Sequence, residues 1–296
     1  MRIVSLLPSA SEILFALGLG EEVVGVTFEC DHPPEARSRR IVSTSTLPAG
    51  LAPAEIDARV RERIARGDDL YHLDRDAFAD IGPDLIVTQD LCAVCAVDVS
   101  EVEGALAHLG CEAQVVTLDP MRLDEVIASV NTVGEATGRT AAAAALMSSL
   151  RARLATLSAQ LDGVRRRPAL VLEWTDPPFS AGHWVPDMVA AGGGAEVLGR
   201  AGERSEAVTW DRVWSSGAEV VIVSPCGYRL DGAVGLAREL VAAGHLPVGA
   251  EVWAVDADAY VVRPGPRVVD GCEMVASVLH PRHCGEPDAG AARQLA

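Results

Sequence analysis

The sequence predicts an α/β protein of two Rossmann-like α/β lobes joined by one long helix. Three observations lead to this prediction. Short apolar runs, typical of buried parallel strands, alternate with amphipathic helical segments in both halves of the chain. Residues 123–161 are compatible with helix almost throughout, and a helix connects lobes more rigidly than a Gly/Ser linker. The length of 296 residues allows two domains, each with a sizeable core.

The first lobe is expected over residues 1–119. Its first helix should follow the strand Arg2–Leu6, because Ser9 and Glu12 have the spacing of a capping box, and Gly18 should end that helix. The other predicted strands are Val23–Thr27, Arg40–Val42, Leu70–Leu73, Leu85–Val87 and Ala113–Thr117. The other predicted helices are Ala54–Arg66, Arg75–Ile81 and Ser100–Leu109.

Residues 120–166 are expected to connect the lobes, with a short helix and then a long one over Thr140–Leu161. The alanine run in that segment has high helix propensity. The second lobe is expected over 167–281, and residues 282–296 as a flexible tail. Its predicted strands are Ala169–Glu173, Glu219–Val223, Val252–Val255 and Tyr260–Val262. Its predicted helices are Trp184–Ala191, Trp210–Ser215, Val234–Ala243 and Pro266–Leu279.

Composition excludes several classes of function. The net charge of −17 is the opposite of what a nucleic-acid-binding protein needs. No apolar run approaches the roughly 18 residues that a membrane span requires. Met1 and Arg2 lead directly into a strand without the features of a secretory signal, which predicts a cytoplasmic location. Seven cysteines, an odd number, argue against a complete disulfide framework and suit a reducing compartment.

Four cysteines follow predicted strands. Cys92 and Cys95 form a C-x-x-C after one strand, and Cys30 and Cys226 follow two others. In open α/β sheets ligands bind beyond the carboxyl ends of the strands, so the four thiols are candidates for one metal site. Tetrahedral zinc and iron–sulfur clusters both take four thiolates. A redox pair and a coincidental spacing remain open interpretations of a single C-x-x-C.

Aromatic and polar residues near the predicted strand ends are the other candidates for ligand binding. Trp174 and Trp184 flank one predicted loop, and a large planar ligand favours aromatic walls. His32 and His183 are either ligands of cobalt or iron, or hydrogen-bonding loop residues. Motifs of nucleophilic hydrolases, phosphate-binding loops and zinc peptidases are absent, so an enzyme is not the favoured interpretation. A metal cluster with one open coordination position would still permit an enzymatic activity.

Several motifs together resemble a known family. They are residues 2–12, 25–27, 31–34 and 82–87 in the first half, and 176–182, 192–194 and 263–271 in the second. The chain is similar to the helical-backbone, or class III, substrate-binding proteins, and most of all to their cobalamin-binding branch. Members bind cobalamin, haem or iron siderophores for ABC importers. The resemblance covers nearly the whole chain and implies a ligand cleft between the two lobes.

The resemblance also implies which loops line that cleft: residues 7–9, 28–33, 89–94, 174–184 and 224–228. The candidate ligand-binding residues are Pro8, Ser9, Glu29, Asp31, His32, Gln89, Asp90, Leu91, Glu173, Trp174, Phe179, His183, Trp184 and Tyr228. The candidate metal ligands are Cys30, Cys92, Cys95 and Cys226. Two departures from the family are the missing export signal and these thiols, which cobalamin-binding members do not need.

Three functions remain open at this level. The first is an intracellular protein that binds cobalamin or a similar corrinoid or metal-containing cofactor. The second is a zinc or iron–sulfur protein, a sensor or an enzyme, that uses the four cysteines. The third is an ABC-importer receptor without its export signal, which would have an ABC permease as partner only if exported. Cobalamin titration separates the first from the second, because fold alone does not fix function.

Overall fold

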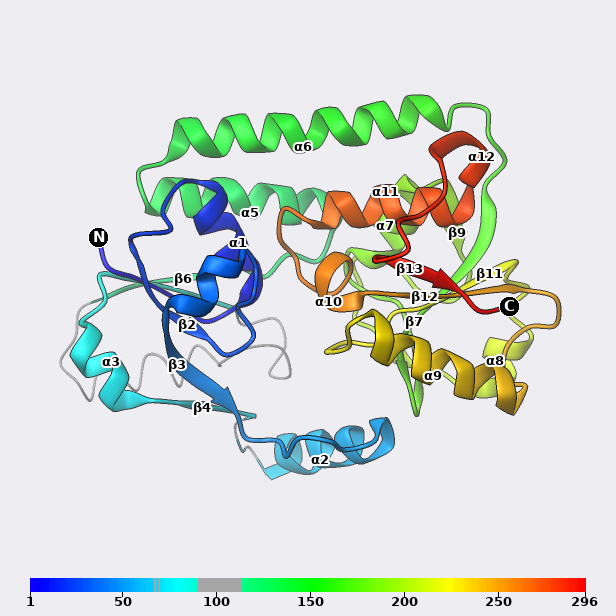
Figure 1. The fold of residues 1–296 in the computed structure, drawn as a ribbon, viewed down its shortest axis with the longest axis horizontal. Coiled ribbons are helices and arrows are strands. Elements are labelled where there is room, and N and C mark those ends of the chain that lie inside the picture. The colour runs from blue at the N-terminus through cyan, green and yellow to red at the C-terminus, as the bar shows by residue number, and fades with distance from the viewer. Residues whose placement is uncertain (67, 69, 90–112) are drawn as a thin grey trace. The chain divides into compact units, whose positions relative to one another are not determined.

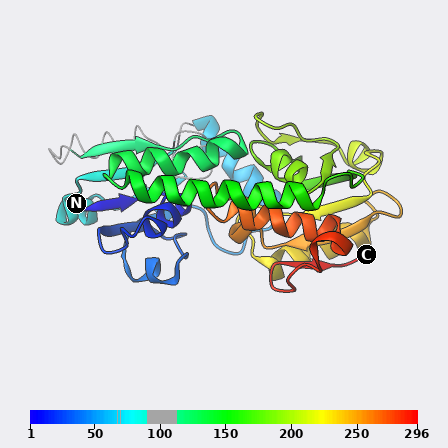
Figure 2. The same cartoon turned by 90° about the horizontal axis from the view of Figure 1, so that it is seen from above.

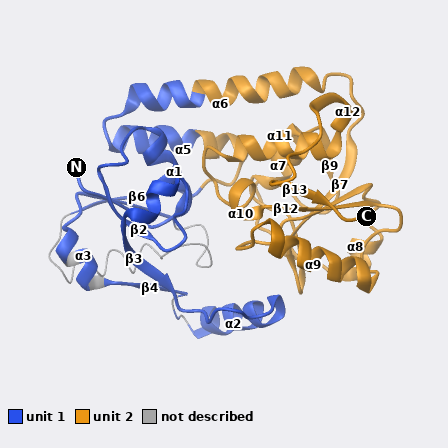
Figure 3. Cartoon of the chain, in the orientation of Figure 1, with its two compact units in different colours: residues 1–119, 128–147 blue, residues 120–127, 148–296 orange. Residues whose placement is uncertain are grey.

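The computed structural model describes residues 1–66, 68, 70–89 and 113–296. The chain forms two compact units (Figure 3). Unit 1 comprises residues 1–119 and 128–147, and unit 2 comprises residues 120–127 and 148–296. Each unit contains a sheet with helices, which confirms the predicted class of two α/β lobes. The long helix is also present: α6, Thr140–Gln160, is uninterrupted (Figure 2), and its residues are divided between the two units.

The sheet of unit 1 has the strand order β4-β3-β2-β1-β5-β6. Strands β2, β3, β4 and β6 are labelled in Figure 1. All neighbouring strands are parallel except β3 and β4. The strands are β1 (Ile3–Ser5), β2 (Val23–Thr27), β3 (Arg40–Ser45), β4 (Tyr71–Leu73), β5 (Leu85–Thr88) and β6 (Gln114–Thr117). The helices are α1 (Pro8–Ala16), the 3-10 helix η1 (Pro34–Ser38), α2 (Pro53–Arg66), α3 (Arg75–Ile81) and α5 (Leu123–Ala136), of which α5 begins in unit 2.

Alternation along β1 and β5 builds a core on each face of this sheet. Ile3 and Leu85 join one buried cluster, and their neighbours Val4 and Ile86 join another. Successive side chains of a strand point to opposite faces, so a strand that is covered on both faces is apolar throughout. This explains why the short apolar runs correctly predicted the parallel strands.

The sheet of unit 2 has the order β10-β8-β7-β11-β12-β13, and β9 pairs with β7. Strands β7, β11 and β12 are parallel, and β8 and β13 are antiparallel additions. The strands are β7 (Arg167–Thr175), β8 (Pro178–Ser180), β9 (Gly194–Glu196), β10 (Glu206–Ala207), β11 (Val220–Val223), β12 (Glu251–Val255) and β13 (Ala292–Gln294). The helices are α7 (Val185–Ala191), α8 (Trp210–Trp214), α9 (Leu230–Ala243), α10 (Ala257–Tyr260), α11 (Val268–Leu279) and α12 (Pro281–Cys284).

Three local predictions are corrected. Helix α1 starts at Pro8 with Leu7 as N-cap and without a side-chain cap, so Ser9 and Glu12 form no capping box. The predicted strand Tyr260–Val262 is absent, because Asp256 accepts the Ala259 N–H and starts helix α10, which ends at Tyr260, and the N–H groups of Val261 and Val262 bond back to the Ala257 carbonyl in a turn. The predicted flexible tail contains α12 and β13, which pairs with β12 and extends the sheet. The predicted helix Ser100–Leu109 lies outside the described residues.

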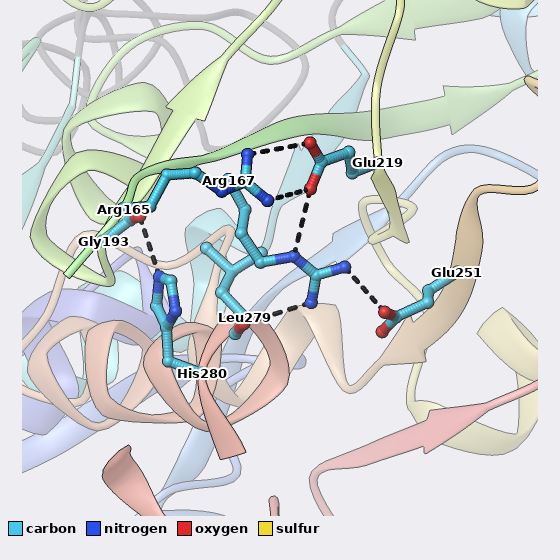
Figure 4. Close-up of polar contacts among 7 residues, drawn as sticks. All are labelled: Arg165, Arg167, Gly193, Glu219, Glu251, Leu279 and His280. Carbon is cyan, nitrogen blue, oxygen red and sulfur yellow. Dashed lines mark hydrogen bonds and ion pairs between the residues drawn. The ribbon is translucent and has the colours of Figure 1, made fainter. Parts of the chain in front are cut away.

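Ion pairs join the strands of unit 2 at their amino ends (Figure 4). Arg165 makes a bidentate contact with Glu219, which precedes β11. Arg167, the first residue of β7, lies 3.6 Å from Glu219 and donates to Glu251 on β12 at 2.6 Å and to the Leu279 carbonyl at 3.1 Å. This edge of the sheet is therefore closed by paired charges, which leaves the opposite edge for ligands. Within the described part of the chain, no helix is both long and apolar enough to span a membrane.

Candidate ligand-binding site

The parallel strands of both units end in polar residues. We call this end of each sheet its carboxyl edge. Ligands of open α/β sheets bind there, so polar groups at these positions are available for recognition. Among the described residues, those buried at or directly after the end of a parallel strand include Ser5, Thr27, Thr88 and Gln89 in unit 1, and Thr175, Ser224 and Asp256 in unit 2.

A chain of hydrogen bonds orders the carboxyl edge of unit 1. Ser5 Oγ donates to the Leu7 carbonyl at 2.9 Å, and Ser11 Oγ lies 2.9 Å from Ser5 Oγ and 3.0 Å from Cys30 Sγ. A hydroxyl has one proton, so Ser11 donates in only one of its two contacts. If it donates to Ser5, then the Cys30 thiol donates to Ser11. The chain connects the loops after β1 and β2 through buried groups.

The other predicted residues of unit 1 lie around this chain. Pro8 and Ser9 are buried in the first turn of α1. Glu29 and His32 are partly buried, and Asp31 forms an ion pair with Arg37 at 3.5 Å. Gln89 is buried directly after β5, and its Nε2 has no hydrogen-bond partner among the described residues. Asp90, Leu91, Cys92 and Cys95 lie outside the described residues, so their predicted roles stay predictions.

One exposed aromatic residue of unit 1 was not among the predicted site residues. Phe28 directly follows β2, is 41% exposed, and its ring centroid lies 6.4 Å from that of Tyr71. Single exposed apolar side chains are common on protein surfaces, so the exposure of Phe28 does not by itself assign it a role. The sequence did indicate its location, because Phe28 lies within the loop 28–33 that was predicted to line the ligand site.

Three predicted aromatic residues gather at the carboxyl edge of unit 2, and we call them the aromatic cluster: Trp174, Phe179 and Tyr228. Trp174 on β7 pairs with Phe179 on β8, and directly opposed residues share one face of a sheet. The Trp174 and Tyr228 rings meet edge to face with centroids 5.9 Å apart. All three side chains are partly buried. Such a cluster offers an apolar, π-rich surface for a flat ligand.

Two partly buried acids of unit 2 have strongly perturbed pKa values: Glu173, which precedes Trp174 on β7, and Glu196 on β9, which pairs with Ala169 nearer the amino end of β7. Glu173 accepts the Gly182 N–H at 3.0 Å and contacts the Ser205 hydroxyl. Burial raises the pKa of Glu173 to about 7, against the weaker opposing effect of these hydrogen bonds. Glu196 on β9 accepts backbone N–H groups of Val171, Leu198 and Gly199. Burial, with a smaller contribution from the negative charge of Glu173, raises the pKa of Glu196 to about 7.

The remaining predicted residues of unit 2 differ in accessibility. His183 has a left-handed backbone (φ 51°), and burial, followed by the nearby Arg204 charge, lowers its pKa. Trp184 is only 6% exposed and donates its indole N–H to the Val261 carbonyl at 2.8 Å, so its ring lies in the core of unit 2. Cys226 is exposed, and its backbone N–H binds the Glu173 carbonyl at 3.0 Å.

The four-cysteine site is not assembled from described residues alone. Cys30 is in unit 1 and Cys226 is in unit 2, while Cys92 and Cys95 lie outside the described residues. Across the described residues, no group of three or more His, Cys, Asp or Glu side chains is arranged to hold a metal ion. The thiol site therefore stays a prediction.

Comparison with known proteins identifies the family. The profile of the periplasmic binding protein family matches residues 3–241. An uncharacterized ABC transporter substrate-binding lipoprotein of Bacillus subtilis strain 168, YvrC, is 25% identical over 299 residues, which cover 95% of this chain and 80% of the relative.

Solved structures share the fold. The periplasmic vitamin B12 binding protein BtuF of Vibrio cholerae matches with a TM-score of 0.68 and 21% identity, over 94% of this chain and 96% of BtuF. A periplasmic heme binding protein from Pseudomonas aeruginosa matches with a TM-score of 0.69 and 18% identity, over 100% of this chain and 95% of that one. At these identities the likeness concerns the fold, whereas the profile covers most of the sequence. The chain therefore belongs to the periplasmic binding protein family.

Proposed function

We propose that this protein binds a large, flat, metal-containing cofactor, with cobalamin or a similar corrinoid as the first candidate, at the carboxyl edge of the unit 2 sheet. The aromatic cluster Trp174–Phe179–Tyr228 is the observation that supports this most directly. Structural relatives named for vitamin B12 and for heme add to the support. The acidic chain, with its net charge of −17, favours a ligand without a high negative charge.

The aromatic cluster would contribute most of the binding energy that unit 2 supplies. Aromatic residues in partly desolvated positions are common hot spots, and truncating one costs about 2 kcal/mol or more. That loss corresponds to roughly thirtyfold in affinity. Trp174 is central, because it contacts Tyr228 and pairs with Phe179.

Titration of the purified protein with cyanocobalamin and, separately, with hemin tests the proposal. Tryptophan fluorescence quenching is the readout, since the five tryptophans all lie in unit 2. We expect saturable binding of one probe and a loss of roughly thirtyfold in Trp174→Ala. Trp214→Ala is the matched control, because Trp214 is 56% exposed on α8 and lies outside the aromatic cluster. Absence of binding to both probes, or an equal loss in the two variants, would reject the proposal.

The cysteine hypothesis is the second candidate. Its support is positional: Cys30 and Cys226 each follow a strand at the carboxyl edge of their own unit. Elemental analysis for cobalt, iron and zinc, with acid-labile sulfide, on protein purified without oxygen tests it. If the thiols hold the metal, the content of zinc, or of iron and sulfide, should fall in the double variant Cys92→Ser with Cys95→Ser. A metal content that does not change in that variant would rule out the thiol site.

A further inference from the structure

The loop between β11 and α9 carries Tyr228 to the aromatic cluster. Its first part is attached to β7, because the Cys226 N–H donates to the Glu173 carbonyl at 3.0 Å. Glu173 directly precedes Trp174 on that strand. The start of the loop is therefore held, and the position of the Tyr228 ring depends on the part of the loop that follows.

A tight turn leads into Tyr228. The Tyr228 N–H donates to the Pro225 carbonyl at 3.1 Å, and Gly227 has a left-handed backbone with φ 82°. A positive φ at the third position of such a turn favours glycine, which has no Cβ atom to clash. Cys226 and Gly227 are exposed, so the turn has little packing of its own and depends on contacts with other elements.

The first of these contacts comes from α10, the short helix after β12 (Figure 1). Asp258 in its first turn accepts the Gly227 N–H at Oδ1, with a distance of 3.1 Å. Its other carboxylate oxygen lies 3.9 Å from Arg263 Nη2, and its side chain is only 16% exposed. Hydrogen bonds to a carboxylate are roughly twice as strong as those between neutral groups. Asp258 therefore fixes the turn residue that directly precedes Tyr228.

The second contact comes from α9, where Gly232 leaves room for the Tyr228 ring. A Cβ atom added to Gly232 would lie 2.8 Å from Cδ1 of Tyr228, which is closer than such atoms approach in proteins. The ring therefore lies directly on the first turn of α9, and the same ring meets Trp174 edge to face with centroids 5.9 Å apart. A Cβ atom added to Gly235, three residues further along α9, would have no neighbour within 4 Å. The close approach thus belongs to Gly232.

We propose that Gly232 and Asp258 are positioning residues for ligand binding: Gly232 gives the Tyr228 ring the space to lie against Trp174, and Asp258 holds the preceding residue so that the ring stays there. The proposal rests on the proposed function, since it concerns the same aromatic cluster. It adds two residues that act through Tyr228 and need not touch the ligand. A ring that is already held in place loses less conformational entropy on binding, which raises affinity.

A pair of substitutions on α9 tests the role of Gly232. In Gly232→Ala the new methyl group displaces the Tyr228 ring, and we expect the affinity for cyanocobalamin to fall by roughly tenfold. Gly235→Ala is the matched control and should leave the affinity unchanged, because its methyl group meets no other atom. Both positions lie in the same helix and gain the helix propensity of alanine, so helix stability does not explain a loss in one variant alone. Equal affinities in the two variants would overturn the proposal.

The same titration tests Asp258. Asp258→Ala removes the acceptor of the Gly227 N–H, and we expect the affinity to fall by roughly fivefold. Asp258→Asn keeps an oxygen acceptor but loses the charge that faces Arg263, so it should recover most of that loss. In a Tyr228→Ala background, Asp258→Ala should have no further effect, because the ring that it positions is absent. Additive losses would mean that Asp258 acts on the ligand directly or on folding, and would reject the positioning role.

A measurement without ligand separates this proposal from the proposed function. In protein labelled with fluorotryptophan, the fluorine NMR signal of Trp174 is identified by its loss in Trp174→Phe. Tyr228→Ala removes the adjoining ring and should shift this signal. Gly232→Ala and Asp258→Ala should shift it in the same direction, whereas Gly235→Ala should not.

The two measurements fail in different ways. A Trp174 signal that stays in place in Gly232→Ala and Asp258→Ala would reject the positioning role, even if cyanocobalamin binds. The expected shifts without any binding of cyanocobalamin would reject cobalamin as the ligand and support the positioning of Tyr228.

Discussion

The amino edge of the unit 2 sheet, where its parallel strands begin, and the carboxyl edge, where they end, differ in how charged side chains are partnered. At the amino edge, Arg165, Arg167, Glu219 and Glu251 are paired across three parallel strands (Figure 4). Towards the carboxyl edge, Glu173 accepts hydrogen bonds from the neutral Gly182 N–H and Ser205 O–H groups, and burial raises its pKa. The difference indicates that paired charges stabilise the amino edge, whereas the acid next to Trp174 lowers stability when it is ionised. Conflicts with local stability are expected at functional sites.

The largest effect expected from this comparison is a dependence of stability on pH. Glu173 and Glu196 each have a pKa raised from 4.5 to about 7, so between these values the folded state binds more protons than the unfolded state. Their contribution is fully present below about pH 4.5 and is lost as pH rises to about 7. For one such group the loss is about 3 kcal/mol. Urea unfolding followed by tryptophan fluorescence should show this decline.

The variants Glu173→Gln and Glu196→Gln sharpen that measurement. Each should remove part of the decline, and the double variant should remove most of it, because neither of these two carboxyl groups then ionises. A decline of the same size in the double variant would show that other groups cause it, and the contrast between the two edges would lose its basis.

An intermediate effect is expected at the amino edge. Arg167→Met should destabilise unit 2 by about 1.5–3 kcal/mol, because the side chain makes hydrogen bonds to Glu251 and to the Leu279 carbonyl from a largely buried position. Arg165→Met is the matched control. Its side chain is 68% exposed, and exposed ion pairs add little, so stability should hardly change. If thermal unfolding showed the same loss of stability in both variants, the buried hydrogen bonds of Arg167 would not be what stabilises the amino edge.

The smallest effects concern two buried serines at the carboxyl edges. Ser5 belongs to the hydrogen-bond chain of unit 1, so Ser5→Ala should cost about 1 kcal/mol. Ser224 is fully buried, and its Oγ has no partner within the described residues, so Ser224→Ala should be neutral or stabilising by up to about 1 kcal/mol. Chemical denaturation measures both. A clear loss of stability in Ser224→Ala would show that its hydroxyl is satisfied, for example by a buried water.

The strands were predictable because burial on both faces requires apolar runs, as in Val220–Val223 and Leu85–Thr88. Strands β8, β9 and β10 have two or three residues each, too few for a pattern, and depend on their pairing with β7 or β8. Asp256 illustrates another limit of prediction from sequence, because its capping side chain starts helix α10 next to the position where a strand was predicted.

The site was predictable where it depends on strand ends and unpredictable where it depends on packing. Trp174, Phe179 and Tyr228 were all predicted, and the structure gathers them at one edge, although their role in binding is still a prediction. The contact of Glu173 with Ser205 joins residues 32 positions apart, and sequence spacing does not reveal it. Nor does sequence alone distinguish a partly buried Trp174 from Trp184, whose ring lies in the core.

The divided chain of unit 1 has a consequence for its synthesis. Val130, Val133 and Ala143 belong to the same buried cluster as Ile3 and Leu14, so residues of α5 and α6 complete a core that begins at the N-terminus. Domains commonly fold while the ribosome still makes the rest of the chain. Here the core of unit 1 is complete only when residue 147 has left the exit tunnel, by which time more than half of the polypeptide has been made. A nascent chain arrested at residue 119 should accordingly be sensitive to protease, and one arrested well beyond residue 147 should be resistant over unit 1.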